Sequence, residues 1–124
     1  MKIREIMKSP AISVKPEETI GEALEIMYRD KINGMPVIDQ AYNLLGIVVR
    51  ADIYRFLIEP GHYRSCPVEW VMTKEVEKVE IDEDIKEAAI RLRKKNVIAL
   101  PVMDGDKTVG VISIEDLLDY YIND

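Results

Sequence analysis

Gly110-Val111-Ile112-Ser113-Ile114-Glu115-Asp116 joins a strand pattern directly to the start of a helix. The β-branched pair Val111 and Ile112 favours a strand, and Ser113 followed by Glu115 and Asp116 favours the beginning of a helix. The first N–H groups of a helix have no partner within it, so such a corner can bind an anion or a polar ligand. The same residues also form a capping-box pattern that only stabilises the helix. The stretch alone leaves both interpretations open.

The chain contains a second copy of this corner, because a shift of 65 residues superposes its two halves. A repeat of this kind determines the architecture of a chain, so it is identified before single elements are assigned. The matched pairs are Met7 and Met72, Val14 and Val79, Glu18 and Glu83, Ile20 and Ile85, Pro36 and Pro101, Asp39 and Asp104, and, with one residue deleted in the next turn, Gly46 and Gly110, and Asp52 and Asp116.

Each copy is predicted to fold as β-α-β-β-α after a short helical lead-in at 3–7 or 68–72. Thr19 and Glu22 form a capping box ahead of apolar residues at helical spacing, which predicts a helix from residue 20 onward. The other expected elements are strand 12–14, strands 35–38 and 44–49 and helix 51–58 in the first copy, and strand 76–79, helix 84–95, strands 99–103 and 108–112 and helix 114–122 in the second.

The copies are assigned to residues 1–58 and 68–124, and residues 59–67, with Pro60, Gly61 and Pro67, form the linker. A unit of this size cannot bury its apolar strands and helix face alone. The two copies are therefore expected to pack sheet to sheet about a pseudo-two-fold axis. The predicted fold class is α+β, with both repeats forming one compact module.

Composition and charge exclude several classes of function. The chain has 124 residues, 48% of them hydrophobic, and its 17 Lys and Arg against 23 Asp and Glu give a formal net charge of −6. This charge argues against nucleic acid and anionic membranes as partners. No stretch approaches the roughly 18 apolar residues of a membrane span, and the amino terminus lacks the apolar segment of a signal peptide. A cytoplasmic protein is expected.

The sequence offers little for catalysis or for metal binding. Cys66 is the only cysteine and His62 the only histidine, and both lie in the predicted linker. A transition-metal site usually needs several such ligands, and no motif frames the two as a nucleophile and its base. We expect no metal, no catalytic residue and no enzymatic activity. A single cysteine also agrees with a reducing compartment.

The repeat resembles the tandem cystathionine β-synthase (CBS) domain pair, also called a Bateman module. The resemblance covers nearly the whole chain. It is carried by the lead-ins that end in Met7 and Met72, by the strands Met35-Pro36-Val37-Ile38-Asp39 and Leu100-Pro101-Val102-Met103-Asp104, and by the corners that end in Asp52 and Asp116. The resemblance implies a regulatory module that binds an adenosyl ligand, namely AMP, ADP, ATP or S-adenosylmethionine, between the repeats.

The family pattern Gly-x-x-[Ser/Thr]-x-x-Asp assigns roles to individual residues by this resemblance. Asp116 is implied to accept hydrogen bonds from the ribose hydroxyls, and Ser113 to contact phosphate or a nearby polar group. A carboxylate suits a ribose diol, because it accepts from two donors in charge-assisted hydrogen bonds. The resemblance places the adenine against the other repeat. The full candidate set is Pro10, Ala11, Ile12, Ile32, Asn33, Asp52, Ser113, Glu115 and Asp116.

Departures from the family pattern bear on the identity of the ligand. Val49 replaces the hydroxyl residue in the first copy, so the Asp52 cleft is expected to be empty, weaker or occupied by a less charged ligand. Relatives that hold phosphates often carry a basic residue ahead of the strand proline, where this chain has Asn33-Gly34 and Ile98-Ala99. Positive charge is then left to Lys8, Arg50 or Lys74, and S-adenosylmethionine remains a candidate.

The resemblance also implies a homodimer and an unidentified regulated protein as partners. Aromatic residues are enriched at interfaces, so Trp70, Tyr120 and Tyr121 are candidates for a dimer surface. The alternative function is a ligand-free dimerisation scaffold, in which Ser113 and Asp116 do no more than cap a helix.

Overall fold

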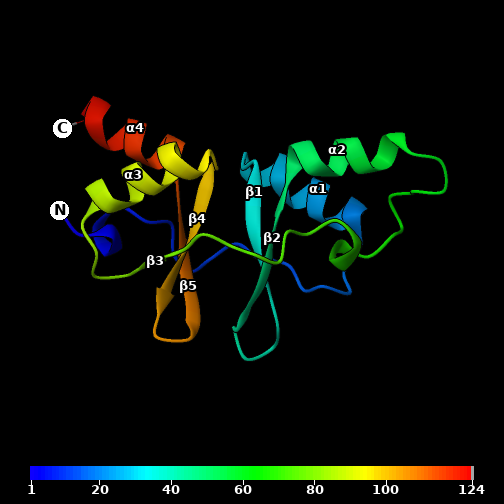
Figure 1. Cartoon of the computed structure of the whole chain (residues 1–124), viewed down its shortest axis with the longest axis horizontal. Coiled ribbons are helices and arrows are strands. Elements are labelled where there is room, and N and C mark those ends of the chain that lie inside the picture. Colours follow the sequence, from blue (N-terminus) through cyan, green and yellow to red (C-terminus); the bar gives the residue numbers. More distant parts are fainter. Residues whose placement is uncertain (124) are drawn as a thin grey trace.

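The computed structural model describes residues 1–123 as two similar halves side by side, with helices on one side and hairpin tips on the other (Figure 1). Two short 3₁₀ helices, Ile3–Glu5 and Val68–Trp70, lead into the halves. The first half contains α1 (Ile20–Asp30), β1 (Gly34–Ile38), β2 (Leu44–Val49) and α2 (Arg50–Ile58), and the second contains β3 (Val79–Glu80), α3 (Ile85–Lys95), β4 (Ala99–Asp104), β5 (Lys107–Ser113) and α4 (Ile114–Asn123).

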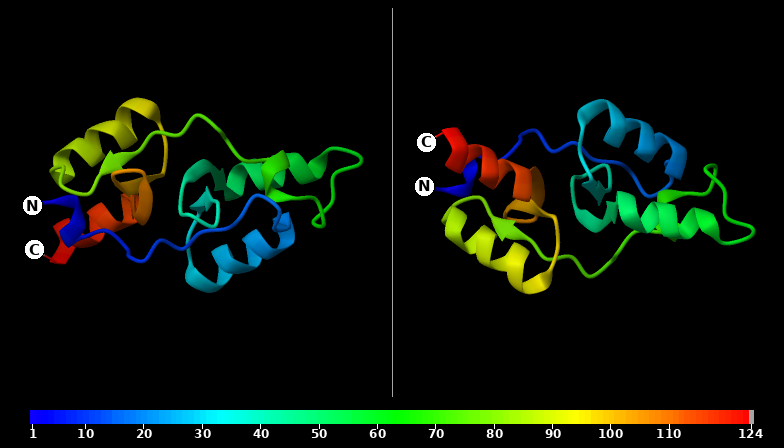
Figure 2. Two further views of the ribbon diagram at one scale, coloured as in Figure 1. Left: turned by 90° about the horizontal axis from the view of Figure 1, so that it is seen from below. Right: turned by 90° about the horizontal axis from the view of Figure 1, so that it is seen from above.

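The α+β fold and its two repeats agree with the sequence prediction. Both hairpins, β1–β2 and β4–β5, are antiparallel, and β3 lies parallel to β4 at the edge of a three-stranded sheet. The sheets of the two halves face each other through β1 against β4 and β5. The two views of Figure 2 show the pseudo-two-fold arrangement, with a helix pair over each sheet.

The predicted strand 12–14 is wrong as a strand, because only Val14 pairs, in a single parallel bridge to Val37. Val14 donates to Pro36 O at 3.1 Å and accepts from Ile38 N at 2.9 Å. The next bond of the ladder would come from the N–H of Pro16, which proline lacks. At the corresponding place in the second half Ile81 donates to Met103 O at 2.9 Å, and β3 forms.

The helix termini follow the predicted local signals. Thr19 Oγ1 accepts from Glu22 N at 3.1 Å while Glu22 Oε1 accepts from Thr19 N at 3.3 Å, so the capping box is confirmed. The C-cap residues that follow α1 and α3 are Lys31 and Asn96, whose φ angles of 56° and 55° are left-handed. The two repeats therefore share the backbone conformation of equivalent single residues.

Each half has its own buried core, and the two lead-ins are exchanged between the cores. Ile3 packs into the second core, with Leu100 and Ile112, while Val68 packs into the first. Each lead-in thus precedes one repeat in the sequence but packs into the core of the other. This exchange joins the repeats tightly and places the first lead-in beside β5.

Gly46 and Gly110 make room for the exchanged lead-ins. A Cβ at Gly110 would lie 2.8 Å from Lys8 O, and one at Gly46 would lie 2.7 Å from Thr73 O. The lead-in backbone runs along the strand at both places: Lys8 exchanges hydrogen bonds with Val111 at 2.9 and 3.0 Å, and Thr73 does so with Ile47 at 2.8 and 2.9 Å. Any larger residue at either glycine would push the lead-in away.

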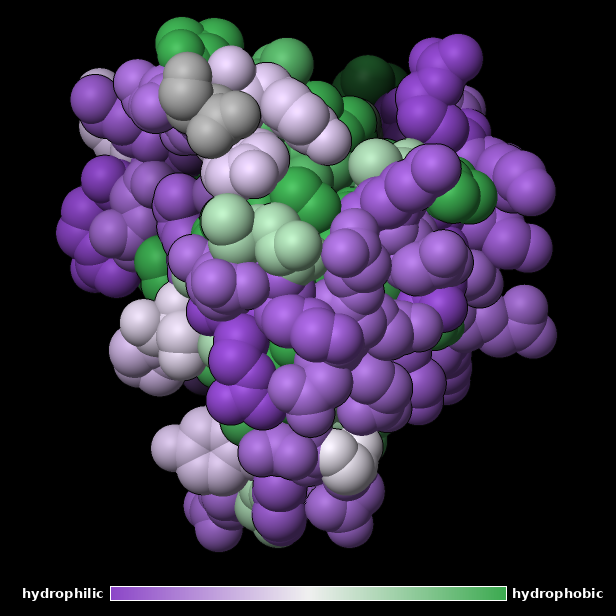
Figure 3. All heavy atoms as spheres, turned by 90° about the vertical axis from the view of Figure 1, so that its left-hand side faces the viewer, coloured by the Kyte–Doolittle hydropathy of each residue, from purple (hydrophilic) through white to green (hydrophobic). Residues whose placement is uncertain are grey.

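Several exposed apolar side chains lie on helices: Tyr28 on α1, Tyr54 and Ile58 on α2, and Leu118, Tyr121 and Ile122 on α4. Figure 3 shows hydrophobic and weakly polar side chains gathered along the upper edge of the α3–α4 end, above a mainly hydrophilic face. Among residues 1–123, no helix has the length and apolar composition needed to cross a membrane.

Candidate ligand site between the repeats

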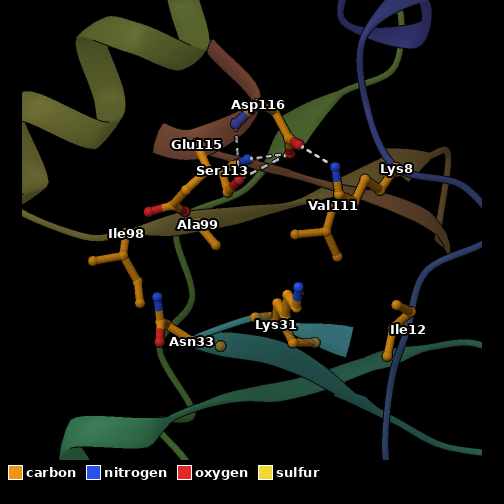
Figure 4. Close-up of a pocket in the computed structure, with 12 residues that line it drawn as sticks. Lys8, Ile12, Lys31, Asn33, Ile98, Ala99, Val111, Ser113, Glu115 and Asp116 are labelled. Atoms are coloured by element: carbon orange, nitrogen blue, oxygen red, sulfur yellow. Dashed lines mark hydrogen bonds and ion pairs between the residues drawn. The ribbon is translucent and has the colours of Figure 1, made fainter. Parts of the chain in front are cut away.

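A cavity of about 60 Å³ lies between the two halves at the start of α4 (Figure 4). Its walls come from the first lead-in, from the segment between α1 and β1, and from the strand–helix corner of the second half. The lining residues are Lys8, Ile12, Lys31, Ile32, Asn33, Gly34, Ile98, Ala99, Val111, Ser113, Glu115 and Asp116. Both repeats contribute to the site, as a ligand that bridges them would require.

One oxygen of Asp116 caps helix α4. Asp116 Oδ2 accepts from Ser113 N at 2.8 Å and from Ser113 Oγ at 2.9 Å, and Ser113 Oγ accepts from Asp116 N at 3.2 Å. This is the reciprocal pattern of a capping box. The Ser113–Asp116 motif therefore does cap the helix, and the cap uses one of the two carboxylate oxygens of Asp116.

The other oxygen, Asp116 Oδ1, accepts from Lys8 Nζ at 2.7 Å. The Asp116 side chain is only 4% exposed, whereas the Lys8 side chain is 58% exposed and approaches from the solvent side. The hydrogen bond to Asp116 raises the pKa of the Lys8 ammonium, so Lys8 stays charged at neutral pH. Figure 4 shows the Lys8 side chain directed toward the Asp116 carboxylate.

The cavity brings together most of the residues predicted from the sequence. Ile12, Ile32 and Asn33 line it from the first repeat and the lead-in, opposite Ser113, Glu115 and Asp116. Pro10 and Ala11 are not among its lining residues. Their prediction rested on the family resemblance, which places the adenine against this segment, and of its three residues only Ile12 lines the cavity.

Other lining residues were not predicted, namely Lys31, Gly34, Ile98, Ala99 and Val111. The repeat could have indicated Ile98, because it is the equivalent in the second copy of Asn33, which was predicted. Asn33 O accepts from Arg50 N at 2.8 Å, and Ile98 O accepts from Ile114 N at 3.1 Å. The residue that precedes β1 or β4 thus accepts a hydrogen bond from the first residue of α2 or α4.

Only one of the three candidate sources of positive charge faces Asp116. Lys8 pairs with it directly. The Arg50 guanidinium instead donates to Ile32 O at 3.0 Å, and its buried Nε has no partner. Lys74 does not line the Asp116 cavity.

Asp52 lies in a separate cavity of about 300 Å³, the pseudo-symmetric counterpart of the first. Its carboxylate is paired with Arg55 of the same helix, and the N-cap residue of α2, Val49, provides no side-chain cap. Glu75 and Glu77 add two further carboxylates to the walls. Thr73 stands where Lys8 stands in the other cavity, so no lysine from the lead-in reaches Asp52.

The family model described as "CBS domain" matches residues 3–59 and 68–123. An inosine-5′-monophosphate dehydrogenase of Aquifex aeolicus is 39% identical over 113 residues, which cover 86% of this chain but only 22% of that enzyme. The chain spans a similarly small share of other enzymes that it matches. A CBS domain-containing protein of Methanocaldococcus jannaschii is 32% identical over 124 residues, which cover 99% of this chain and 97% of the relative.

A solved structure is similar over almost its whole length. It is a CBS domain pair in complex with 5′-methylthioadenosine and S-adenosyl-L-methionine, with a TM-score of 0.89 and 27% identity, covering 99% of this chain and 97% of that chain. The repeat, the fold and the family match lead to one conclusion: the chain belongs to the CBS domain family, as a tandem pair of CBS repeats.

Proposed function

We propose that the chain is a regulatory module that binds an adenosyl ligand in the Asp116 cavity and passes the binding event to a partner protein. The observation that carries this proposal is the position of Asp116: a buried carboxylate with one oxygen, Oδ1, directed into a cavity lined by both repeats. AMP, ADP, ATP and S-adenosylmethionine are the candidate ligands, and no enzymatic activity is assigned to the chain itself.

The walls of the cavity suit an adenosyl group. Asp116 Oδ1 would accept from the ribose hydroxyls in place of Lys8, and the apolar side chains of Ile12, Ile32 and Ile98 would contact the purine. Adenosyl ligands in the similar CBS domain pair support this class of ligand.

Signalling follows from the position of the ligand between the repeats. A ligand that contacts both halves better in one relative orientation shifts the population toward that orientation. The partner that responds is a separate protein or a domain of the kind to which the longer relatives join their CBS pair. A homodimer through α2 and α4 is part of the proposal, because their exposed apolar residues form the surface expected to be covered by a second copy.

Thermal unfolding with and without ligand tests the proposal. AMP, ATP or S-adenosylmethionine at millimolar concentration should raise the melting temperature of the wild type, because a ligand that binds only the folded state stabilises it. Asp116→Asn should abolish the rise. Asn can still accept from Ser113, so the cap of α4 is largely retained, but it lacks the charge that the ribose position requires.

The alternative, a ligand-free dimerisation scaffold, predicts a different result. In that case no adenosyl compound shifts the melting temperature of the wild type, while the dimer persists. Asp116→Asn would then change stability only.

A further inference from the structure

We propose that in the ligand-free protein Lys8 blocks Asp116 Oδ1, the oxygen that would bind the ribose hydroxyls. When the ligand displaces it, the Lys8 ammonium pairs with an anionic group of the ligand. The site would then select adenine nucleotides that carry a phosphate over neutral adenosine. This inference rests on the proposed function and names both the class of ligand and the residue that sets the selection.

The geometry shows that Lys8 and a ribose compete for one atom. Asp116 Oδ2 is already used by the N–H and the hydroxyl of Ser113, at 2.8 and 2.9 Å. Oδ1 remains, and Lys8 Nζ lies 2.7 Å from it (Figure 4). The cavity of about 60 Å³ is far below the roughly 300 to 1,000 Å³ of small-molecule sites, so side chains that line it, Lys8 among them, must move to admit an adenosyl ligand.

The other repeat provides an internal comparison. Lys8 and Thr73 occupy equivalent places, each with its backbone paired to the neighbouring strand, at Val111 and Ile47. Where the side chain is threonine, the cavity has about 300 Å³, and where it is lysine, about 60 Å³. The equivalent of Glu115 is Ala51, so the smaller volume accompanies two longer side chains, Lys8 and Glu115.

Displacement of Lys8 has an electrostatic cost that depends on the ligand. The Asp116 side chain is almost fully buried, and a buried carboxylate that loses its counter-charge is destabilised. A neutral ribose replaces the hydrogen bond that Lys8 donates to Asp116, but it leaves the Lys8 ammonium without an anionic partner. A phosphate gives that ammonium a new partner, and the exposed, flexible Lys8 side chain can turn toward it while its backbone stays on Val111.

The charges around the two cavities agree with this selection. Lys8 and Lys31 balance Glu115 and Asp116, so the Asp116 cavity has no net charge from its lining residues. The Asp52 cavity has Arg55 against three carboxylates, Asp52, Glu75 and Glu77, and is acidic. An anionic ligand is therefore favoured at Asp116 relative to Asp52.

Calorimetric titration of the full chain with AMP and with adenosine tests the inference on the wild type and on Lys8→Thr, which copies the residue of the other repeat. The wild type should bind AMP about two- to fivefold more tightly than adenosine, the effect of one partly exposed charge pair. In Lys8→Thr, adenosine should bind more tightly than in the wild type, AMP should lose its advantage, and the affinity ratio should approach one.

Two variants serve as controls. Lys74→Thr removes a lysine that does not line the cavity and should keep the wild-type ratio, and Lys8→Arg keeps the charge and should retain a preference for AMP. An unchanged ratio in Lys8→Thr, or weaker adenosine binding in that variant, overturns the inference while the proposed function stands. If neither compound binds the wild type or Lys8→Thr, the proposed function fails, and the inference fails with it.

Discussion

The two carboxylate oxygens of Asp116 have different partners in the structure. The sequence posed helix capping and ligand binding as alternatives for Ser113 and Asp116, but the structure assigns capping to Oδ2 and leaves Oδ1 to the cavity. Lys8 occupies Oδ1 from a lead-in 108 residues away in the chain. The two interpretations are therefore compatible, and single substitutions can separate them.

Ser113→Ala should reduce stability without abolishing ligand binding. The variant removes the hydroxyl that accepts from Asp116 N, and the loss of such an N-cap costs about 0.5 to 2 kcal/mol. Asp116 Oδ2 keeps the Ser113 N–H, and Oδ1 is unchanged, so the affinity for AMP should change by no more than about threefold, or about 0.7 kcal/mol. Urea denaturation and calorimetry measure the two effects. Loss of binding as complete as in Asp116→Asn would assign the hydroxyl a direct role in the ligand site.

The sequence predicted the elements better than the contacts between them. The capping box at Thr19 and the apolar pattern of 44–49 are local signals, and β2 begins and ends as predicted. Lys31 and Val111 could not be placed in the cavity in this way, because their position depends on how the halves pack. The exchange of the lead-ins, which brings Lys8 to Asp116, likewise has no local signal.

At the scale of elements, the turn before α3 contains an ion pair that the first repeat lacks. Glu83 accepts from Arg91 Nη1 and Nη2 at 2.8 and 2.7 Å, and from Glu80 N at 2.9 Å. The hydrogen bond from Arg91 lowers the pKa of the Glu83 carboxyl below its ordinary value of 4.5. The equivalent Glu18 accepts from Lys15 N.

Glu83→Gln should therefore lower stability in a pH-dependent way. A carboxyl whose pKa is lower in the folded state stabilises that state above its unfolded pKa and loses the contribution as pH falls through the folded pKa. The difference in melting temperature between wild type and variant should be largest at neutral pH and shrink below pH 4.5. The pair is partly exposed, so we expect about 1 kcal/mol or less at neutral pH. A constant difference from pH 7 to pH 3 would contradict this assignment.

Gly110→Ala should weaken the attachment of the first lead-in to β5. The added Cβ would meet Lys8 O and Met7 Sδ, each at 2.8 Å, so the backbone of the lead-in must move. Overpacking of this kind typically costs about 1 to 3 kcal/mol, which chemical denaturation measures. Gly21→Ala is the matched control, because its Cβ would lie 3.4 Å from the nearest atom and the helix favours alanine. Equal stability of the two variants would contradict the role of Gly110.

At the scale of the whole molecule, the aromatic residues predicted for a dimer surface differ in exposure and in position. Tyr121 is exposed on α4 and Trp70 is exposed in the second lead-in, while Tyr120 is half-buried beside Tyr121. Tyr121 is continuous with the exposed Leu118 and Ile122 of the same helix, and aromatic residues of this kind often dominate interfaces.

Tyr121→Asn should shift a dimer toward monomer in sedimentation equilibrium, with an increase in the dissociation constant of about tenfold or more. Tyr42→Asn is the matched control. Tyr42 is similarly exposed but lies at a hairpin tip away from the helices, with a positive φ that asparagine tolerates. Equal dissociation constants for the two variants would place the interface elsewhere.

The most direct test of the central claim is a crystal structure of the chain grown with AMP. We predict the nucleotide between the two repeats, with its ribose hydroxyls within hydrogen-bond distance of Asp116 Oδ1, its purine against Ile12 and Ile32, and the Lys8 ammonium moved from Asp116 to the phosphate. AMP bound elsewhere, or an intact Lys8–Asp116 pair beside a bound nucleotide, would contradict the account.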